Sequence, residues 1–252
     1  MARRDAILAF LDELLDPASF DDHGPNGLQV PGAEEVATVV TGVSAHLELF
    51  ERAAEAGAQL VLCHHGLFWD GQPRSISPQL KARLQVLFDS DASLAAYHLP
   101  LDAHGEVGNN ALICAALGLR PDEPFGRHRG RPIGWIGRFE EPVLAGDLVE
   151  RCASTFGHPP LVFDGGREQV RAVGVVSGGG ASLLAEAAAR GLDAFLTGEP
   201  AEHSMADARE MGVHFIAAGH YATETFGVRR LGELLEERFG VAHRFLEIPN
   251  PV

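Results

Sequence analysis

The sequence has few basic residues. It contains 20 Lys and Arg against 35 Asp and Glu among 252 residues, which gives a formal net charge of -15. The densest basic stretch is RHRGR at 127–131. Proteins that bind nucleic acids through phosphate groups need many Lys and Arg contacts, so this composition argues against nucleic-acid binding. An acidic surface would also repel phosphorylated substrates unless metal ions restored a positive potential locally.

Long hydrophobic runs and cysteine pairs are also missing. No apolar run approaches the roughly 20 residues that a membrane-spanning helix needs. The opening MARRDAILAFLDELLD carries acids where a signal peptide needs an uninterrupted apolar core. We therefore expect a cytoplasmic protein without a membrane segment. The three cysteines, Cys63, Cys114 and Cys152, form no CxxC pair, so we expect buried free thiols rather than disulfides or a thiolate zinc site.

The common motifs for phosphate binding and for serine nucleophiles are absent. There is no GxGxxG, no GK(S/T) loop and no GxSxG elbow. The glycine-rich SGGGAS at 177–182 is therefore interpreted as a tight turn with a serine cap, although its backbone amides could also hold an anion at a helix start. GPNGLQV at 24–30 is interpreted as an Asn-Gly turn that leads into a strand.

Short apolar segments alternate with helical patterns along most of the chain. Residues 3–15 have the apolar spacing of an amphipathic helix. Strands that alternate with helices predict an α/β architecture with mostly parallel strands flanked by helices. We expect strands at 36–43, 58–64, 93–98, 170–176, 193–197 and 213–218, and helices at 46–56, 79–88, 181–190 and 201–211.

The middle of the chain has a different character. Residues 121–170 are rich in Pro, Gly and Arg. Within them, RPIGWIGRFE predicts a strand, and EPVLAGDLVERCASTFG predicts a helix that is entered through proline. We therefore expect a small α+β element between two related α/β halves, at 1–120 and 171–252, with the halves forming one compact domain.

An internal repeat relates the two halves. VVTGVSAHLELFERAAEAGAQLVLCHHG (39–66) aligns with VVSGGGASLLAEAAARGLDAFLTGE (175–199), and AAYHLPLD (95–102) aligns with AAGHYATE (217–224). Each half thus has a histidine near a strand end and a carboxylate four residues later. Functional groups gather at the carboxyl ends of parallel strands. The repeat therefore predicts a cluster of ligand-type residues at these ends: His64, His65, His98, Asp102, His220 and Glu224.

This combination of residue types favours a metal site. A lone histidine after an apolar strand is more often a core or capping residue, but several His and acid groups at strand ends are not expected by chance. Imidazole and carboxylate ligands without thiolates suit zinc, iron, manganese, cobalt or nickel. The candidates exceed what one tetrahedral zinc ion needs, so we predict a dinuclear centre. Two ions about 3.5 to 4 Å apart would share a bridging water and lower its pKa, which makes hydrolysis the default chemistry.

Glu199 occupies the repeat position that is equivalent to His65. Two interpretations of its carboxylate are open. It supports the ligands or carries protons, or it lies at a helix N-terminus and interacts with the helix dipole.

Six segments together resemble a known family: NGLQV, CHHGLFW, YHLPLDAHGEVGNN, LTGE, AAGHYATETFGVRRL and the terminal IPNPV. With HHG, H-x3-D and GH-x3-E in this order, the chain resembles the Nif-three-like dinuclear metal centre proteins over nearly its whole length. It is most similar to the compact bacterial members labelled GTP cyclohydrolase I type 2 homologues. The resemblance implies that His65 and Asp102 bind one ion, that His64 and His220 bind the other, and that Glu224 bridges both.

The resemblance also implies a function and an assembly. His98 would lie beside the metals as a supporting or acid/base group. The assembly would be a toroidal homohexamer, a trimer of dimers. The activity would be that of a metal-dependent hydrolase or cyclohydrolase, with a metal-bridging hydroxide and a small nucleotide- or pterin-like substrate. A non-catalytic metal-handling or cofactor-assembly protein is the alternative.

Overall fold

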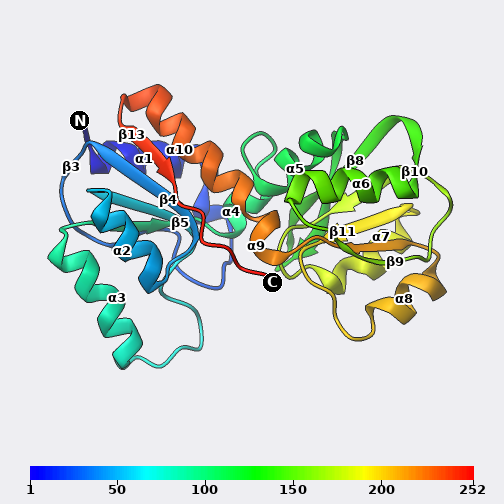
Figure 1. The fold of residues 1–252 in the computed structure, drawn as a ribbon, viewed down its shortest axis with the longest axis horizontal. Coiled ribbons are helices and arrows are strands. Elements are labelled where there is room, and N and C mark those ends of the chain that lie inside the picture. Colours follow the sequence, from blue (N-terminus) through cyan, green and yellow to red (C-terminus); the bar gives the residue numbers. More distant parts are fainter. The chain divides into compact units, whose positions relative to one another are not determined.

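The computed structural model describes residues 1–252, and the chain divides into two compact units. Unit 1 comprises Met1–Leu101 and Gly227–Pro249, and unit 2 comprises Asp102–Phe226 and Asn250–Val252. Each unit contains a central sheet with helices against it (Figure 1). The protein is therefore of the mixed α/β class, as the alternation in the sequence predicted.

Unit 1 has a five-stranded sheet in the order β13-β4-β5-β6-β2. Its pairs are parallel except β2 with β6. The strands are β2 (Gly27–Val30), β4 (Thr38–Ser44), β5 (Leu60–His65), β6 (Ser93–Ala96) and β13 (Ala242–Phe245), and a small ribbon joins β1 (Ala2–Arg3) to β3 (Glu35–Val36). The helical segments are α1 (Arg4–Leu15), η1 (Pro17–Ser19), α2 (Leu47–Glu55), α3 (Pro78–Asp89), the start of α4 (Leu99–Ala103) and most of α10 (Thr225–Phe239).

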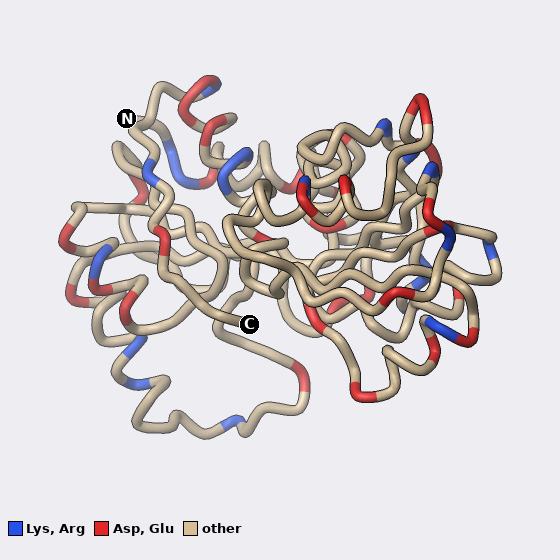
Figure 2. The backbone as a smooth tube through the Cα atoms, turned by 45° about the vertical axis from the view of Figure 1, so that its right-hand side comes forward, with Lys and Arg blue, Asp and Glu red and all other residues tan.

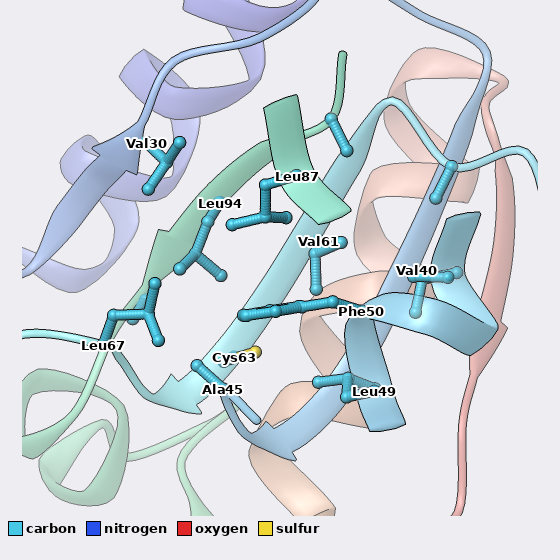
Figure 3. Packing of buried hydrophobic residues seen from close by; sticks show 14 residues of the cluster. Val30, Val40, Ala45, Leu49, Phe50, Val61, Cys63, Leu67, Leu87 and Leu94 are labelled. Carbon is cyan, nitrogen blue, oxygen red and sulfur yellow. The ribbon is translucent and has the colours of Figure 1, made fainter. Parts of the chain in front are cut away.

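One part of the core of unit 1 is formed by its sheet and helices α2 and α3. Phe50 of α2 packs against Val61 and Cys63 of β5 (Figure 3). Val61 and Cys63 share one face of the strand because side chains alternate along it. Burial of each large apolar side chain contributes about 1.5–3 kcal/mol to folding. This packing holds the end of β5, and with it the two histidines that follow Cys63, in a fixed place.

The three thiols are free and buried, as predicted. Burial raises the pKa of Cys63 and raises the pKa of Cys114 and Cys152 to about 12. Since the thiolate is the reactive form, we expect no reaction of the native protein with an aromatic disulfide reagent at pH 8. In guanidinium chloride all three thiols should react. Rapid reaction of the folded protein would contradict this packing.

Unit 2 has a six-stranded sheet in the order β7-β8-β10-β11-β12-β9. Strands β10, β11 and β12 are parallel, and the outer pairs are antiparallel. The strands are β7 (Arg120–His128), β8 (Arg131–Leu144), β9 (Leu161–Phe163), β10 (Gln169–Val175), β11 (Ala194–Thr197) and β12 (His214–Ala217). The helical segments are α5 (Asn109–Leu117), α6 (Ala145–Phe156), η2 (Ala181–Leu183), α7 (Leu184–Ala189), α8 (Ser204–Met211) and α9 (His220–Thr223). No helix of the chain is both long and apolar enough to cross a membrane.

The strands of residues 121–170 pair within the sheet of unit 2. Strands β7 and β8 join the sheet through the pairing of β8 with β10, and β9 joins through β12. Pro121 and Pro124 fit in β7 because it is an edge strand, which needs fewer N–H donors. Residues 121–170 thus belong to unit 2, which comprises Asp102–Phe226 and Asn250–Val252.

The helix expected to start at the proline starts later. Pro142 lies within β8, and α6 begins at Ala145. The pairing of β8 with β10 shifts register between Val170 and Ala172, close to the partner of the proline segment. At such a register shift the regular hydrogen-bond pattern is interrupted, so a residue without an N–H is tolerated. The strand can therefore continue through Pro142.

The basic stretch RHRGR is a hairpin turn. Arg129 and Gly130 both have positive φ, 45° and 87°, and they connect the paired residues His128 and Arg131. This is the backbone form of the tight two-residue hairpin. Elsewhere Lys and Arg occur in short, separated stretches of the chain (Figure 2).

The internal repeat is visible in the topology. In unit 1, β4, β5 and β6 are parallel neighbours, and in unit 2, β10, β11 and β12 are. Cys63 of β5 pairs with Ala96, and the equivalent Thr197 of β11 pairs with Ala217. If Cys63 is matched to Thr197, as in the sequence alignment, this ladder matches Ala96 to Ala217, one residue away from that alignment.

This register corrects one sequence interpretation. His98 corresponds to Gly219, and His220 corresponds to Leu99, the first residue of α4. The H-x3-D and H-x3-E motifs are thus similar in sequence but not equivalent in position. His98 precedes its helix, whereas His220 begins one.

Candidate metal centre

His64 and His65 end strand β5 of unit 1. His64 is completely buried, and the two ring centroids are 4.8 Å apart. Successive side chains of a strand point to opposite sides. The two rings can therefore bind different metal ions from one strand end.

Both rings are held through their Nδ1 atoms. The Nδ1 of His64 lies 3.0 Å from the carbonyl oxygen of Tyr97, which can only accept, so this Nδ1 carries the hydrogen. The Nδ1 of His65 lies 3.0 Å from the Oγ of Ser44, its partner across the β4–β5 ladder. Nε2 is therefore the atom that each ring can offer to a metal ion. A fixed Nδ1 is the usual arrangement of metal-binding histidines.

His98 joins these two histidines. Ring nitrogens of His64, His65 and His98 lie within 4.8 Å of one another. The Nδ1 of His98 is 2.7 Å from Oδ1 of Asp22. The backbone N–H of His98 donates to Oδ1 of Asn26 at 2.8 Å. Sequence reasoning missed Asp22 and Asn26. Their local signal, an Asp and an Asn in a turn, shows only that a loop is stabilised and not which distant residue it contacts.

Asp102 lies in unit 2, where its carboxylate is buried. Its Oδ1 accepts hydrogen bonds from the amide of Asn109 and from the hydroxyl of Ser177, both at 2.9 Å. Neither donor was predicted as a site residue. Two donors on one oxygen fix the plane of the carboxylate, as groups behind a metal ligand do.

We expect Ser177→Ala to weaken metal binding about 10- to 100-fold, the usual cost of losing a group that orients a ligand. The measurement is the dissociation constant of Zn²⁺ or Mn²⁺ by calorimetry. Ser182→Ala, which changes an exposed serine of η2, is the control. Equal affinity of the two variants would show that Ser177 does not orient Asp102.

His220, Glu199 and Glu224 form a second group in unit 2. The Nδ1 of His220 donates to the carboxylate of Glu199, and its Nε2 is 3.1 Å from Oε1 of the buried Glu224. Glu199 precedes α8, which begins at Ser204. Of its two interpretations, the contact with His220 therefore fits the supporting one.

The charge of His220 is governed by these carboxylates. Burial lowers its pKa, but the hydrogen bonds and charges of Glu224 and Glu199 raise it, with a net pKa of about 9. Below that pH the metal-free ring is protonated, and a metal ion must displace the proton.

We therefore expect metal affinity to rise with pH up to about 9, by as much as tenfold per unit. At pH 7.5, calorimetry in buffers of different ionisation enthalpy should show close to one proton released from His220. Glu199→Gln should reduce this release because it removes one cause of the raised pKa. A pH-independent affinity would contradict the assignment.

The glycine-rich segment 177–180 adjoins this group. The amides of Gly178 and Gly180 donate to Thr223 and Thr197, so they hold a turn and not an anion. Gly178 has φ +61°, and a Cβ there would lie 2.3 Å from Oε1 of Glu224 and 3.1 Å from Nε2 of His220. The missing side chain keeps the space beside these two atoms open.

The residues fit a divalent metal ion by three observations. The Nδ1 atoms of the histidines are held, the space beside Glu224 and His220 is kept by a glycine, and the donors are nitrogen and oxygen. Cys63 is next to His64, but burial raises its thiol pKa, so it offers no thiolate. Such a set suits zinc, iron, manganese, cobalt or nickel.

The fold and these residues define a mixed α/β protein with a candidate His and carboxylate metal-binding group. The family model for Duf34/NIF3 (NGG1p interacting factor 3) matches residues 2–251. The chain therefore belongs to the Duf34/NIF3 family, in agreement with the resemblance found in its sequence.

Individual relatives agree over nearly the full length. A Pseudomonas aeruginosa protein named GTP cyclohydrolase 1 type 2 homolog is 42% identical over 240 residues, 95% of each chain. The solved structure of protein ybgI, described as of unknown function, is 40% identical with a TM-score of 0.94 and covers 100% of both chains. TTHA1606 from Thermus thermophilus is 39% identical with a TM-score of 0.90 and the same coverage.

Proposed function

We propose that the protein is a dinuclear metal-dependent hydrolase or cyclohydrolase that acts on a small nucleotide- or pterin-like ring. One observation carries this proposal. Within each unit, histidines with a held Nδ1 are grouped with others or with carboxylates, which is how proteins prepare metal ligands.

In this proposal five residues of the chain are ligands. His65 and Asp102 would hold one ion, His64 and His220 would hold the other, and Glu224 would contact both. Ser44, Tyr97 and Glu199 orient the three histidines through their Nδ1 atoms. Ser177 and Asn109 orient Asp102.

Divalent ions held there would polarise a substrate oxygen and lower the pKa of water, which is the chemistry of hydrolysis. The side chains supply the remaining requirements. Glu199 accepts a hydrogen bond from Nδ1 of His220, so Nε2 is the ring nitrogen left for a metal ion. The acidic chain, with a net charge of -15, would disfavour phosphorylated substrates without such ions.

The names of relatives support the proposed substrate class. Proteins of about this length that share some 40% of their residues with this chain are named GTP cyclohydrolase 1 type 2 homologs. A cyclohydrolase opens a purine-type ring by adding water to a carbon–nitrogen bond. We therefore place hydrolysis of a C–N bond in a nitrogen heterocycle first.

The test compares the wild type with Glu224→Ala, both reconstituted with divalent metals. Each is incubated with a metabolite extract, and consumed compounds are found by mass spectrometry. A heterocycle consumed only by the wild type supports the proposal. No turnover with any metal, or turnover unchanged in Glu224→Ala, would refute it. Release of metal to an apo-protein without turnover would favour the metal-handling alternative.

The proposed assembly is a homohexamer arranged as a trimer of dimers. Light scattering after size-exclusion chromatography measures it directly. Six chains of this sequence support the assembly, and a stable monomer or dimer at micromolar concentration would refute it.

A further inference from the structure

We propose that Asp22 is a positioning residue for His98, and that the two form a dyad in which His98 accepts a proton at the proposed site. The catalytic use of the dyad rests on the proposed hydrolase function. The positioning itself does not, because it can be measured in the metal-free protein.

Asp22 sits at the centre of a hydrogen-bond network in unit 1. Its side chain is 4% exposed. Its Oδ1 accepts from Nδ1 of His98 and from the N–H of His23, both at 2.7 Å. Its Oδ2 accepts from the amide of Asn26 at 2.9 Å and from the N–H of Leu99 at 3.0 Å. The N–H of His23, the amide of Asn26 and the N–H of Leu99 can only donate, and an ionised carboxylate accepts from all three and from Nδ1 of His98.

The same donors explain the charge of Asp22. Burial raises its pKa, but the hydrogen bonds and charge of His98, with the bonds of Asn26 and His23, outweigh burial and lower it strongly. The carboxylate therefore stays ionised at neutral pH. An ionised oxygen at 2.7 Å keeps the hydrogen of His98 on Nδ1. Nε2 is then the ring nitrogen that is left to accept a proton.

Asn26 and Trp69 also hold His98 in place. Asn26 donates to Asp22 and accepts the backbone N–H of His98, so one loop holds both the carboxylate and the main chain of the dyad. The ring of Trp69 meets the ring of His98 edge to face with centroids 5.1 Å apart. These contacts leave His98 little rotational freedom.

His98 also faces a hollow. It lines a small pocket in unit 1 whose wall includes one metal-ligand candidate, two amides and two aromatic rings: His64, Asn26, Gln29, Phe68 and Trp69. Its side chain is 19% exposed, whereas that of Asp22 is nearly covered. A group at the pocket with an orienting carboxylate behind it has the arrangement of a general base.

His98 and the proposed ligand His220 differ in their place relative to the helix that follows. The two histidines are not equivalent positions, because His98 precedes α4 and His220 begins α9. His98 therefore need not repeat the role of His220.

The proposed proton transfer accompanies hydrolysis of a C–N bond in a ring. A water O–H proton passes to Nε2 of His98 while the water oxygen bonds to the ring carbon. His98 then returns this proton to the ring nitrogen as the C–N bond breaks. Asp22 stays ionised throughout and stabilises the transient imidazolium.

The first test is nitrogen-15 NMR of histidine-labelled, metal-free protein. The His98 resonances are assigned as those missing from His98→Gln. In the wild type we expect the hydrogen on Nδ1. In Asp22→Ala the ring should move toward the Nε2–H form, which free histidine prefers, and Asp22→Asn provides a milder variant that is more certain to fold. An unchanged Nδ1–H form in both variants would overturn the positioning role.

The second test separates proton transfer from metal binding. His98→Gln and Asp22→Asn should keep the metal content of the wild type and lower kcat about 100-fold with little change in KM for the metabolite found in the screen. Asp89→Asn, an exposed carboxylate of α3, is the matched control. Loss of metal from His98→Gln would make His98 a ligand and overturn the dyad. Unchanged kcat in Asp22→Asn would also overturn it. Failure to find any substrate counts against the proposed hydrolase and leaves the NMR result standing.

Discussion

Gly178→Ala is expected to abolish high-affinity binding of at least one metal ion. The new Cβ would lie 2.3 Å from Oε1 of Glu224, which is closer than two non-bonded atoms can approach. The carboxylate must therefore leave its position. The positive φ of +61° adds about 1–2 kcal/mol of backbone strain for alanine. Metal content after dialysis, measured by mass spectrometry, should fall by about one ion per chain or more, with a modestly lower melting temperature.

The neighbouring glycine provides the control. A Cβ at Gly179 would meet nothing within 4 Å, and its φ is not in the positive region. Gly179→Ala should therefore bind metal like the wild type. If both variants lose metal, the loop matters only for folding. If neither does, the space beside Glu224 is not the metal site.

Glu224→Gln should reduce metal binding more than any other side-chain change. Its carboxylate is proposed to contact both ions, and the amide has no charge and one oxygen fewer. We expect an affinity loss of at least about 100-fold, the upper end of what losing a mere orienting group costs. Calorimetric titration with Zn²⁺ should show fewer than two ions per chain.

Glu202→Gln changes an exposed acid in the same unit and is the matched control. Glu224 is buried, so thermal unfolding of the metal-free proteins must show that Glu224→Gln is folded. Two tightly bound ions in a folded Glu224→Gln would refute the bridging role.

The strands that carry the site residues could be predicted because their apolar runs are short and continuous. Leu60–His65 and Ala194–Thr197 are fully buried up to their last residues, and such runs are typical of parallel strands. The polar residues after them then had to lie at a strand end. This is why His64, His65 and Glu199 could be identified as candidates from the sequence.

The sheet membership of residues 121–170 could not be predicted. Antiparallel pairing between β8 and β10 depends on which strand is nearby, and no local pattern specifies the partner. Pro124 and Pro142 argued against strands, and their tolerance depends on an edge and on a register shift that appear only in the fold.

The residues that orient His98 and Asp102 could not be predicted from the sequence either. Asp22 contacts His98 across 76 positions, and Ser177 contacts Asp102 across 75. Each sits in a loop whose composition indicates only a turn. The one-residue offset between His98 and His220 likewise depends on ladder register, which an alignment of two short motifs does not determine.

Anomalous diffraction from crystals grown with Zn²⁺ or Mn²⁺ would show whether five named residues of this chain hold two ions. We predict two peaks per chain. One should contact His65 and Asp102, the other His64 and His220, and Glu224 should contact both. A single peak, or peaks that none of these side chains contacts, would contradict the proposed dinuclear centre.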